Sequence, residues 1–246
     1  MSQPQDQPRQ VPEKPLGIKA YGHIPHLPGS RMGPGDHHCH EGQARIATEK
    51  TRDRHDRIIV TEKLDGSCVA VARLEGVITP LIRAGYRAVN SKHFQHRLFH
   101  NWVMENQDRF LRALEEGHRL VGEWLALAHG MRYELPHEPF VVFDYMQEGK
   151  RTPHDRVMEA AAGGGFTTPR LISDNGPFPV AAAQEAIQVS GHGALDPVEG
   201  AVWRVERRGE FDFLAKWVRP DKVDGCYLPE VSGQPEVWNW RPPSEP

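Results

Sequence analysis

The positions of apolar residues predict short β-strands along much of the chain. Residues 67–74 alternate small and apolar side chains, and residues 77–82 resume the pattern after Glu75-Gly76, a turn signal. These two runs predict a β-hairpin. A second hairpin is predicted from the apolar runs 198–206 and 211–218, which flank the turn signal Arg208-Gly209. Separate apolar runs predict further strands at 58–62, 120–125 and 140–146.

Apolar residues at helical spacing mark other regions. In residues 93–114 large apolar side chains recur three or four positions apart, which predicts one or two amphipathic helices with a break at Asn106-Gln107-Asp108. A helix is also expected from Thr152-Pro153 to residue 162, and another over 180–189, whereas the mixed charges of 49–57 predict a short helix or a solvated turn. This order of elements indicates an α+β fold of antiparallel sheets with helices packed outside.

The two ends of the chain lack these patterns. Residues 1–16 start with a stretch rich in Gln and Pro and are expected to form a disordered leader. Residues 17–57 are expected to be a loop-rich segment that packs on the main domain, residues 58–220. Residues 221–246, rich in Pro, Gly and Trp, are expected to form a tail that wraps the surface.

The composition narrows the class of protein. The 246 residues are 38% hydrophobic and 26% charged, which is typical of a globular domain with a substantial core. No apolar run has the length of a membrane span, so no membrane association is expected. Three scattered cysteines favour a cytoplasmic protein without a disulfide framework. A net charge of −3 counts against a protein that merely coats phosphates, but it allows a basic cleft on an acidic body.

A lysine followed by Asp and Gly stands where a strand ends and the first hairpin begins. The segment is Lys63-Leu64-Asp65-Gly66, and alone it is a weak signal, because a surface lysine beside a turn is common. Four further segments follow it in a fixed order, which favours a joint functional interpretation. They are Arg83-Ala84-Gly85, Gly122-Glu123-Trp124, Phe143-Asp144, and Glu199-Gly200-Ala201-Val202 leading to Lys216.

These ordered segments resemble the motifs of the covalent nucleotidyltransferases, which comprise ATP-dependent RNA ligases, DNA ligases and mRNA capping enzymes. The resemblance extends over residues 58–218 and implies a nucleotidyltransferase (ATP-grasp-like) fold, with 58–220 as the catalytic domain. It implies ATP and Mg²⁺ (or Mn²⁺) as cofactors. Lys63 matches the nucleophile of motif I, which carries AMP as a lysyl-adenylate.

The resemblance also implies roles for the other motif residues. Glu123 would accept hydrogen bonds from ribose hydroxyls, and Phe143 would stack on adenine with Val202 as the opposite apolar wall. Glu199 would bind the metal ion or pair with a lysine, and Lys216 would neutralise phosphate charge. The other expected nucleotide-binding residues are Glu62, Arg83 and Gly85.

The chemistry of the nucleophile sets a condition on the site. An amine attacks phosphorus only when it is unprotonated, and the reference pKa of lysine is about 10.4. We therefore expect burial or nearby positive charge, such as a metal ion or Lys216, to lower the pKa of Lys63. The same charges would stabilise the transition state of phosphoryl transfer.

Three features complicate this interpretation. Motif V often has two lysines separated by one residue, but Leu214 occupies the first of these positions; Arg219 could compensate. Glu199 and Val202 fall on opposite faces of an ideal strand, so a bulge or a strand start is needed for both to contact one nucleotide. Phe143 could also be an ordinary core residue, since it lies in an apolar run.

A histidine-rich stretch, Asp36-His37-His38-Cys39-His40, precedes these motifs. Its residue types suit zinc, but adjacent residues seldom converge on one ion, and no matching pair occurs elsewhere in the sequence. A loop near the active site is the preferred interpretation.

The length of the chain after motif V favours one branch of the superfamily, the RNA ligases. Residues 219–246 are too few for the OB-fold that usually follows motif V in DNA ligases and capping enzymes. The expected function is an RNA ligase that seals 3′-hydroxyl/5′-phosphate nicks in double-stranded RNA or RNA/DNA hybrids. It is expected to act as a monomer, with or without an end-healing or clamp protein. The alternatives are a small DNA ligase and a non-sealing nucleic-acid sensor or binding module, against which the joint presence of Lys63, Glu123, Glu199 and Lys216 argues.

Overall fold

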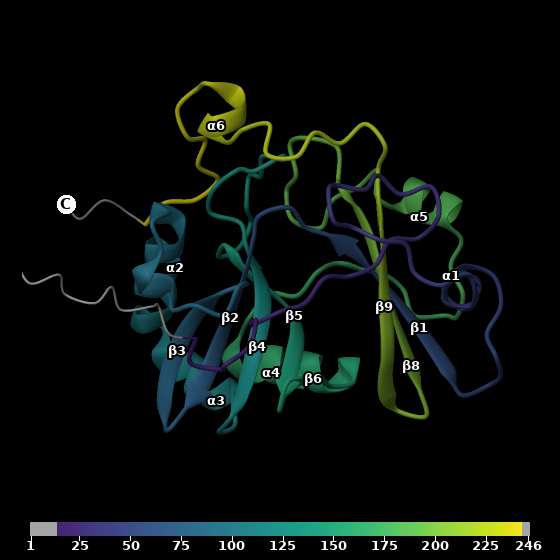
Figure 1. Ribbon diagram of the computed structural model, residues 1–246, viewed down its shortest axis with the longest axis horizontal. Coiled ribbons are helices and arrows are strands. Elements are labelled where there is room, and N and C mark those ends of the chain that lie inside the picture. The colour runs from purple at the N-terminus through teal and green to yellow at the C-terminus, as the bar shows by residue number, and fades with distance from the viewer. Residues whose placement is uncertain (1–13, 243–246) are drawn as a thin grey trace, which may run out of the picture.

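The computed structural model describes residues 14–242 and shows an α+β fold built on two antiparallel sheets (Figure 1). The four-stranded sheet has, in spatial order, β7 (Leu171–Ser173), β1 (Asp56–Lys63), β8 (Gly200–Arg207) and β9 (Glu210–Val218). The five-stranded sheet has β3 (Val77–Ile82), β2 (Ser67–Leu74), β4 (His118–Trp124), β5 (Phe140–Gln147) and β6 (Lys150–Arg151). The predicted fold class is therefore confirmed.

The hairpins follow from their turn residues. Glu75 and Gly76 both have positive φ, and so do Arg208 and Gly209. Two-residue turns of this kind match the twist of antiparallel strands, which explains why both hairpins were predictable from sequence. Glu148 and Gly149 repeat the same geometry between β5 and β6, a third hairpin that the sequence prediction missed.

Helices cover the outer face of each sheet. The five-stranded sheet packs against α2 (Phe94–Glu105), α3 (Gln107–Ala113) and α4 (His154–Gly164), and their shared core includes Phe99, Trp102 and Phe140. The four-stranded sheet packs against α1 (Glu41–Thr48) and α5 (Val180–Ala186). The short elements η1 (Ala88–Asn90) and α6 (Pro229–Ser232) complete the described chain.

The helix predictions were largely confirmed. The break near Asn106 lies between α2 and α3, and α4 ends at Gly165, which has the left-handed backbone of a helix C-terminus. Helix α1 was missed, and residues 49–55 form a solvated turn. That turn is held by ion pairs rather than by helical hydrogen bonds, for example between Arg52 and Asp56.

The segment before α1 crosses the gap between the two sheets (Figure 1). Its Ala20 and Tyr21 N–H groups donate to Arg83 O beside the five-stranded sheet, and Leu27 N donates to Lys216 O in β9. The segment before α1 thus bridges the two sheets, and the cleft described below lies between their inner faces.

The chain after β9 returns to the opposite end of the molecule. Ala128 N donates to Val237 O, and Trp238 and Trp240 pack against the core under α2 and α3. The predicted leader lies mostly in residues 1–13, outside the described residues, and the domain boundaries remain predictions. No helix within residues 14–242 combines the length and the apolarity that a membrane crossing requires.

Candidate active site

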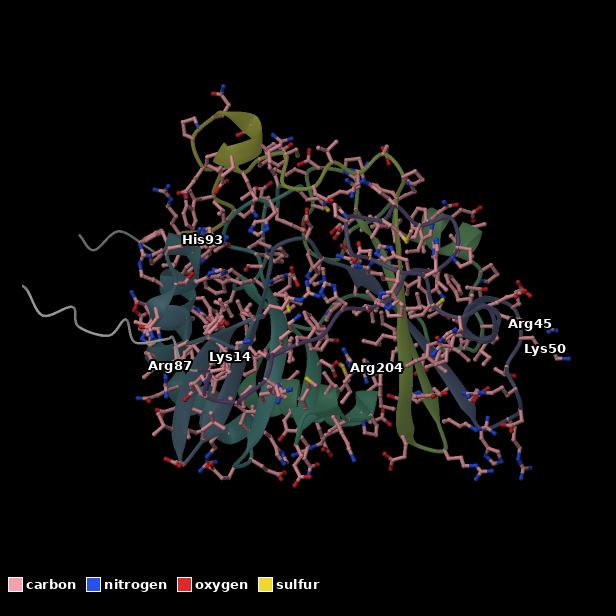
Figure 2. The ribbon with its side chains drawn as sticks, in the orientation of Figure 1. Lys14, Arg45, Lys50, Arg87, His93 and Arg204 are labelled. Atoms are coloured by element: carbon pink, nitrogen blue, oxygen red, sulfur yellow. The ribbon has the colours of Figure 1, made fainter. Side chains whose placement is uncertain are left out.

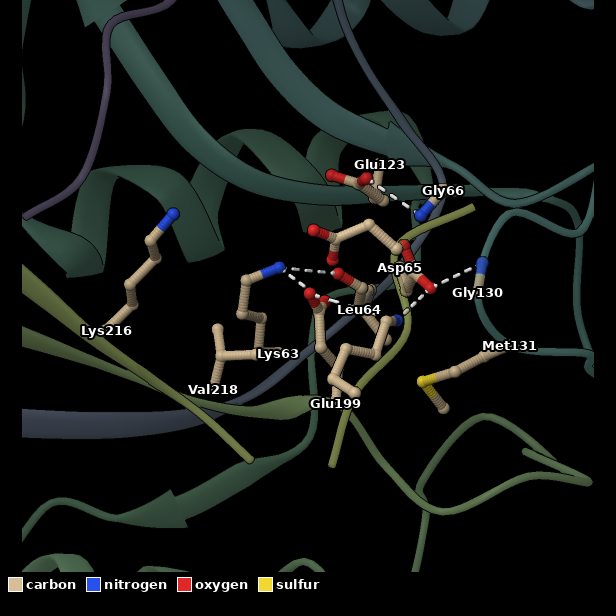
Figure 3. A network of polar contacts seen from close by, with 12 residues as sticks. Lys63, Leu64, Asp65, Gly66, Glu123, Gly130, Met131, Glu199, Lys216 and Val218 are labelled. Atoms are coloured by element: carbon tan, nitrogen blue, oxygen red, sulfur yellow. Dashed lines mark hydrogen bonds and ion pairs between the residues drawn. The ribbon is translucent and has the colours of Figure 1, made fainter. Parts of the chain in front are cut away.

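Lys63 is the last residue of β1, at the edge of the cleft between the sheets. Its Nζ donates to Glu199 Oε2 at 2.5 Å and to Leu64 O at 3.2 Å (Figure 3). Glu199 reaches it because Gly200, the next residue, is paired with Lys63 in the β1–β8 ladder. Strand β8 begins only at Gly200, so Glu199 is free of the strand alternation. The strand start that the sequence required for Glu199 and Val202 to share one side is therefore present.

The residues after Lys63 connect the two sheets. Gly66 N donates to Glu123 Oε1 at 3.0 Å, which joins the start of β2 to the neighbouring strand β4. A Cβ on residue 66 would lie only 2.5 Å from Trp124 O, so only glycine permits this approach. Asp65 Oδ2 accepts the N–H of Gly130 at 2.8 Å. Asp and Gly of the motif thus fix the geometry around the lysine.

The charges at the site keep Lys63 protonated in the free protein. Burial alone would lower the pKa of Lys63, but Glu199 and then Glu123 and Asp65 outweigh it and hold the pKa above its ordinary value. The predicted lowering of the pKa is wrong for this state of the protein. Burial raises the pKa of Glu123 to about 7, partly offset by Lys63.

Phe143 and Asp144 both point toward the cleft, although neighbouring strand residues normally face opposite sides. The β4–β5 register shifts at this point, with Val121 opposite Asp144 and Gly122 opposite Val142, so Phe143 is the extra residue of a β-bulge. Phe143 packs edge-to-face against Tyr21, with ring centroids 5.3 Å apart. The bulge therefore leaves the Phe143 ring partly buried, with one part lining the cavity in the cleft.

The cleft contains a cavity with mainly apolar walls, as is typical of small-molecule sites. Phe143 and Val202 both line it, from the five-stranded and four-stranded sheets respectively, and Lys63 and Glu123 lie at one end. Leu214, where a second motif V lysine was expected, adds to the apolar wall. Packing in the cavity wall thus explains why a leucine occupies position 214.

A buried network of hydrogen bonds and ion pairs around Asp144 includes two residues that line the cavity, Tyr21 and Arg204. Asp144 accepts hydrogen bonds from Tyr21 Oη at 2.9 Å and from Arg204 Nη2 at 2.6 Å. Arg204 extends from β8 into the space between the sheets (Figure 2). The network ties the segment before α1 to both sheets and so holds the cavity walls together.

A second, more open cavity adjoins the first and shares Lys63, Glu123 and Phe143 with it. Arg83 and Lys216 line this second cavity. Burial and the nearby Lys63 lower the pKa of Lys216. The two expected phosphate-binding side chains are therefore brought to the same end of the cleft as the nucleophile.

The two other expected nucleotide-binding residues, Glu62 and Gly85, both make close contacts with other segments of the chain. Glu62 lines the apolar cavity, and its carboxylate accepts hydrogen bonds from Ser190 Oγ, Gly191 N and Arg170 Nε, so it also braces β1 against a loop. Gly85 lines neither cavity; its φ is 95°, and a Cβ there would lie 2.2 Å from Ile18 O. The close approach to Ile18 explains the glycine at position 85, and a nucleotide contact of either residue stays a prediction.

Lys222 is a residue of the site that the sequence analysis missed. Its side chain is buried, and its Nζ donates to Asp65 Oδ2 and lies 3.9 Å from Glu199 Oε1. Arg219, the expected substitute for the absent motif V lysine, instead pairs with Asp221 at 2.6 Å and lines neither of the two cavities around Lys63. Lys222 follows the last strand, where no local pattern marks it.

Among residues 14–242, no group of three or more His, Cys, Asp or Glu side chains is arranged to hold a metal ion. In the histidine-rich stretch, His38 pairs with His26 as part of a β-bridge, and Cys39 packs against the core under α1. Glu199 presents one carboxylate to the Lys63 amine. One carboxylate suits Mg²⁺, which keeps several water ligands and completes its shell with substrate phosphates.

Comparison with known proteins places the chain in a family. The sequence profile of the RNA ligase family matches residues 56–218, most of the chain, and the chain therefore belongs to this family. No curated protein sequence matches it. The motifs from Lys63 to Lys216 all lie within the matched region.

Two solved ligase structures are similar to this chain. A Naegleria gruberi RNA ligase mutant with ATP and Mn is 14% identical, with a TM-score of 0.50 over 85% of this chain and 62% of that chain. An archaeal ATP-dependent RNA ligase is 20% identical, with a TM-score of 0.43 over 67% of this chain and 43% of that chain. The chain thus spans less than two thirds of the length of either protein. The architecture is the ligase nucleotidyltransferase fold.

Proposed function

We propose that this protein is an ATP-dependent RNA ligase that forms a lysyl-adenylate on Lys63 and uses it to seal nicks. The observation that supports this most is the position of the Lys63 amine. It lies at the end of an apolar cavity, with Glu199, Arg83 and Lys216 around the same end. Membership of the RNA ligase family supports the same chemistry.

The first step joins Lys63 to AMP. The Nζ atom attacks the α-phosphorus of ATP, a P–N bond forms, the bond to the β-phosphate oxygen breaks, and pyrophosphate leaves. Lys63 must lose a proton for this, and Glu199 Oε2, at 2.5 Å, is within reach to accept it. Arg83 and Lys216 would neutralise the charge on the phosphates.

Glu199 is also the residue that would hold Mg²⁺ or Mn²⁺. A divalent cation there would neutralise phosphate charge and offset the carboxylates that keep Lys63 protonated. Its carboxylate is already oriented toward the reacting amine. The protein itself contributes the orientation of Glu199, through Gly200 in the β8 ladder, and a cavity with apolar walls for the adenine base.

Phe143→Ala is expected to weaken ATP binding about ten-fold or more, because base–aromatic stacking contributes roughly 1–3 kcal/mol. Phe143→Tyr, which keeps the ring, is the matched control and should bind ATP like the wild type. Titration calorimetry of both variants measures the effect. If a folded Phe143→Ala protein binds ATP as tightly as the wild type, Phe143 serves only to pack against Tyr21.

Sealing is tested with four nicked duplexes that differ only in the sugars flanking the nick. We expect release of AMP and joining of the 3′-hydroxyl to the 5′-phosphate, fastest when the 3′-hydroxyl strand is RNA, since a 2′-hydroxyl offers a contact that DNA lacks. The duplex aligns the two ends and so replaces a bimolecular encounter. The sealing rate should fall steeply as salt rises, because phosphate contacts release counterions.

The outcomes separate the alternatives. Equal or faster sealing of the all-DNA nick would make the protein a DNA ligase. A clean adenylate without sealing of any duplex would indicate a required partner or a different acceptor.

A further inference from the structure

Lys222 is a buried lysine with no role in the chemistry described so far. Its residue is 3% exposed, and it follows the last strand of the four-stranded sheet. A methionine could fill the same space without the cost of desolvating a charge. Burying an ammonium group is tolerated only when it is paired, and here both acidic neighbours, Asp65 and Glu199, belong to the site around Lys63.

The position of the Lys222 side chain is fixed from two sides. A Cβ on Gly130 would lie 2.6 Å from Lys222 Cε and 2.7 Å from Nζ, so a glycine is needed for the lysine to enter. The Gly130 N–H donates to Asp65 Oδ2 (Figure 3). The same oxygen accepts the hydrogen bond of Lys222 Nζ. Tyr227 N donates to His129 O at 2.8 Å, which fastens the segment after Lys222 to the same loop.

The charges around Glu199 show what Lys222 contributes. Glu199 lies between two ammonium groups, with Lys63 Nζ at 2.5 Å from Oε2 and Lys222 Nζ at 3.9 Å from Oε1. When Lys63 becomes a phosphoramidate, its positive charge is lost and an adenylate with negative charge is gained. Of the two ammonium groups beside Glu199, only that of Lys222 then remains charged, and it still binds Asp65.

We infer that Lys222 is a positioning residue that holds Asp65 and Glu199 in place while Lys63 is adenylated, and that it favours the lysyl-adenylate over the free lysine. This inference rests on the proposed adenylation of Lys63. Lys222 lines neither cavity, so it acts through the two carboxylates and does not bind the base. With Arg83 and Lys216, it gives the site three cations besides the nucleophile, although Leu214 replaces one motif V lysine.

The test uses the reversibility of the first step. The full-length protein is incubated with fixed concentrations of ATP, pyrophosphate and Mg²⁺, and the ratio of adenylated to free protein is read by intact-mass analysis. We expect Lys222→Met to lower this equilibrium ratio at least ten-fold while the Kd of ATP changes less than two-fold. A loss of packing alone would not shift the adenylation equilibrium of the molecules that fold.

Two further variants keep the test decisive. Arg219→Met removes a cation from the same segment that pairs only with Asp221, and it should leave the ratio unchanged. Lys222→Gln keeps a hydrogen-bond donor for Asp65 and serves if Lys222→Met does not fold; it should show the same loss. If neither folds, Asp65→Asn with Lys222→Gln is compared with Asp65→Asn alone, and a lower ratio in the double variant is expected.

A wild-type ratio in Lys222→Met or Lys222→Gln overturns the inference, and so does an unchanged ratio in the double variant. If the wild-type protein itself forms no adenylate, the proposed function fails instead. The two failures are therefore distinguishable.

Discussion

Lys63→Met is expected to abolish covalent attachment of AMP while leaving ATP binding within a few fold of the wild type. Methionine keeps the length of the side chain but has no nucleophile. The cavity walls from Phe143 and Val202 are unaffected, so the base still has its site. Intact-mass analysis after incubation with ATP and Mg²⁺ should show one added AMP on the wild type and none on the variant.

The matched control for Lys63→Met is Lys216→Met. Lys216 lines the adjoining cavity, and its loss should slow attachment without moving it, since the nucleophile remains. Peptide mapping then places the adduct on Lys63. An adduct on the Lys63→Met protein would show that another residue is the nucleophile. A wild-type protein that binds ATP and forms no adduct would support the alternative of a non-sealing nucleic-acid sensor.

The rate of adduct formation should also depend on pH in a defined direction. Glu199 and the other nearby carboxylates hold the pKa of Lys63 above its ordinary value, so the amine is mostly protonated near neutrality. Below that pKa the neutral fraction rises ten-fold with each pH unit, and the initial rate should rise with pH accordingly.

The parts of this fold that were predictable from sequence depend on local signals. The hairpins at Glu75-Gly76 and Arg208-Gly209 were predicted because their turn residues adopt backbone conformations that few residues favour. The break between α2 and α3 and the end of α4 were also predictable from local residues, Asn106 and Gly165, which stand at the helix ends. The order of the motifs placed Lys63, Glu123, Phe143 and Glu199, which the structure brings to one cleft.

The parts that were not predictable depend on contacts between distant segments. Lys222 meets Asp65 across 157 positions of the sequence, and nothing around it in the chain marks that contact. The bulge at Phe143 depends on the register of β4 against β5, which the residues 140–146 alone do not define. The raised pKa of Lys63 likewise depends on how three carboxylates converge after folding.

Glu199→Gln is expected to slow adenylation about 100-fold at saturating ATP, the second-largest effect after loss of the nucleophile. The substitution has two opposed consequences. Glu199 is the acidic residue that raises the pKa of Lys63 most, so its neutralisation makes the amine easier to deprotonate and shifts the pH profile to lower pH. An amide, however, is a weaker ligand than a carboxylate for a hard divalent cation and a poorer acceptor for the lysine proton.

We expect the second consequence to dominate, because the barrier to phosphoryl transfer depends chiefly on charge stabilisation and on alignment of the amine. The half-saturating concentration of Mg²⁺ should therefore rise in Glu199→Gln, as measured from initial adenylation rates across a Mg²⁺ titration. Glu206→Gln is the control, because it removes a buried carboxylate from β8, the strand that follows Glu199. The Glu206 carboxylate accepts the His154 N–H and lines neither cavity. Adenylation of Glu199→Gln that is as fast as the wild type at the same Mg²⁺ would reduce Glu199 to a partner that merely keeps Lys63 protonated.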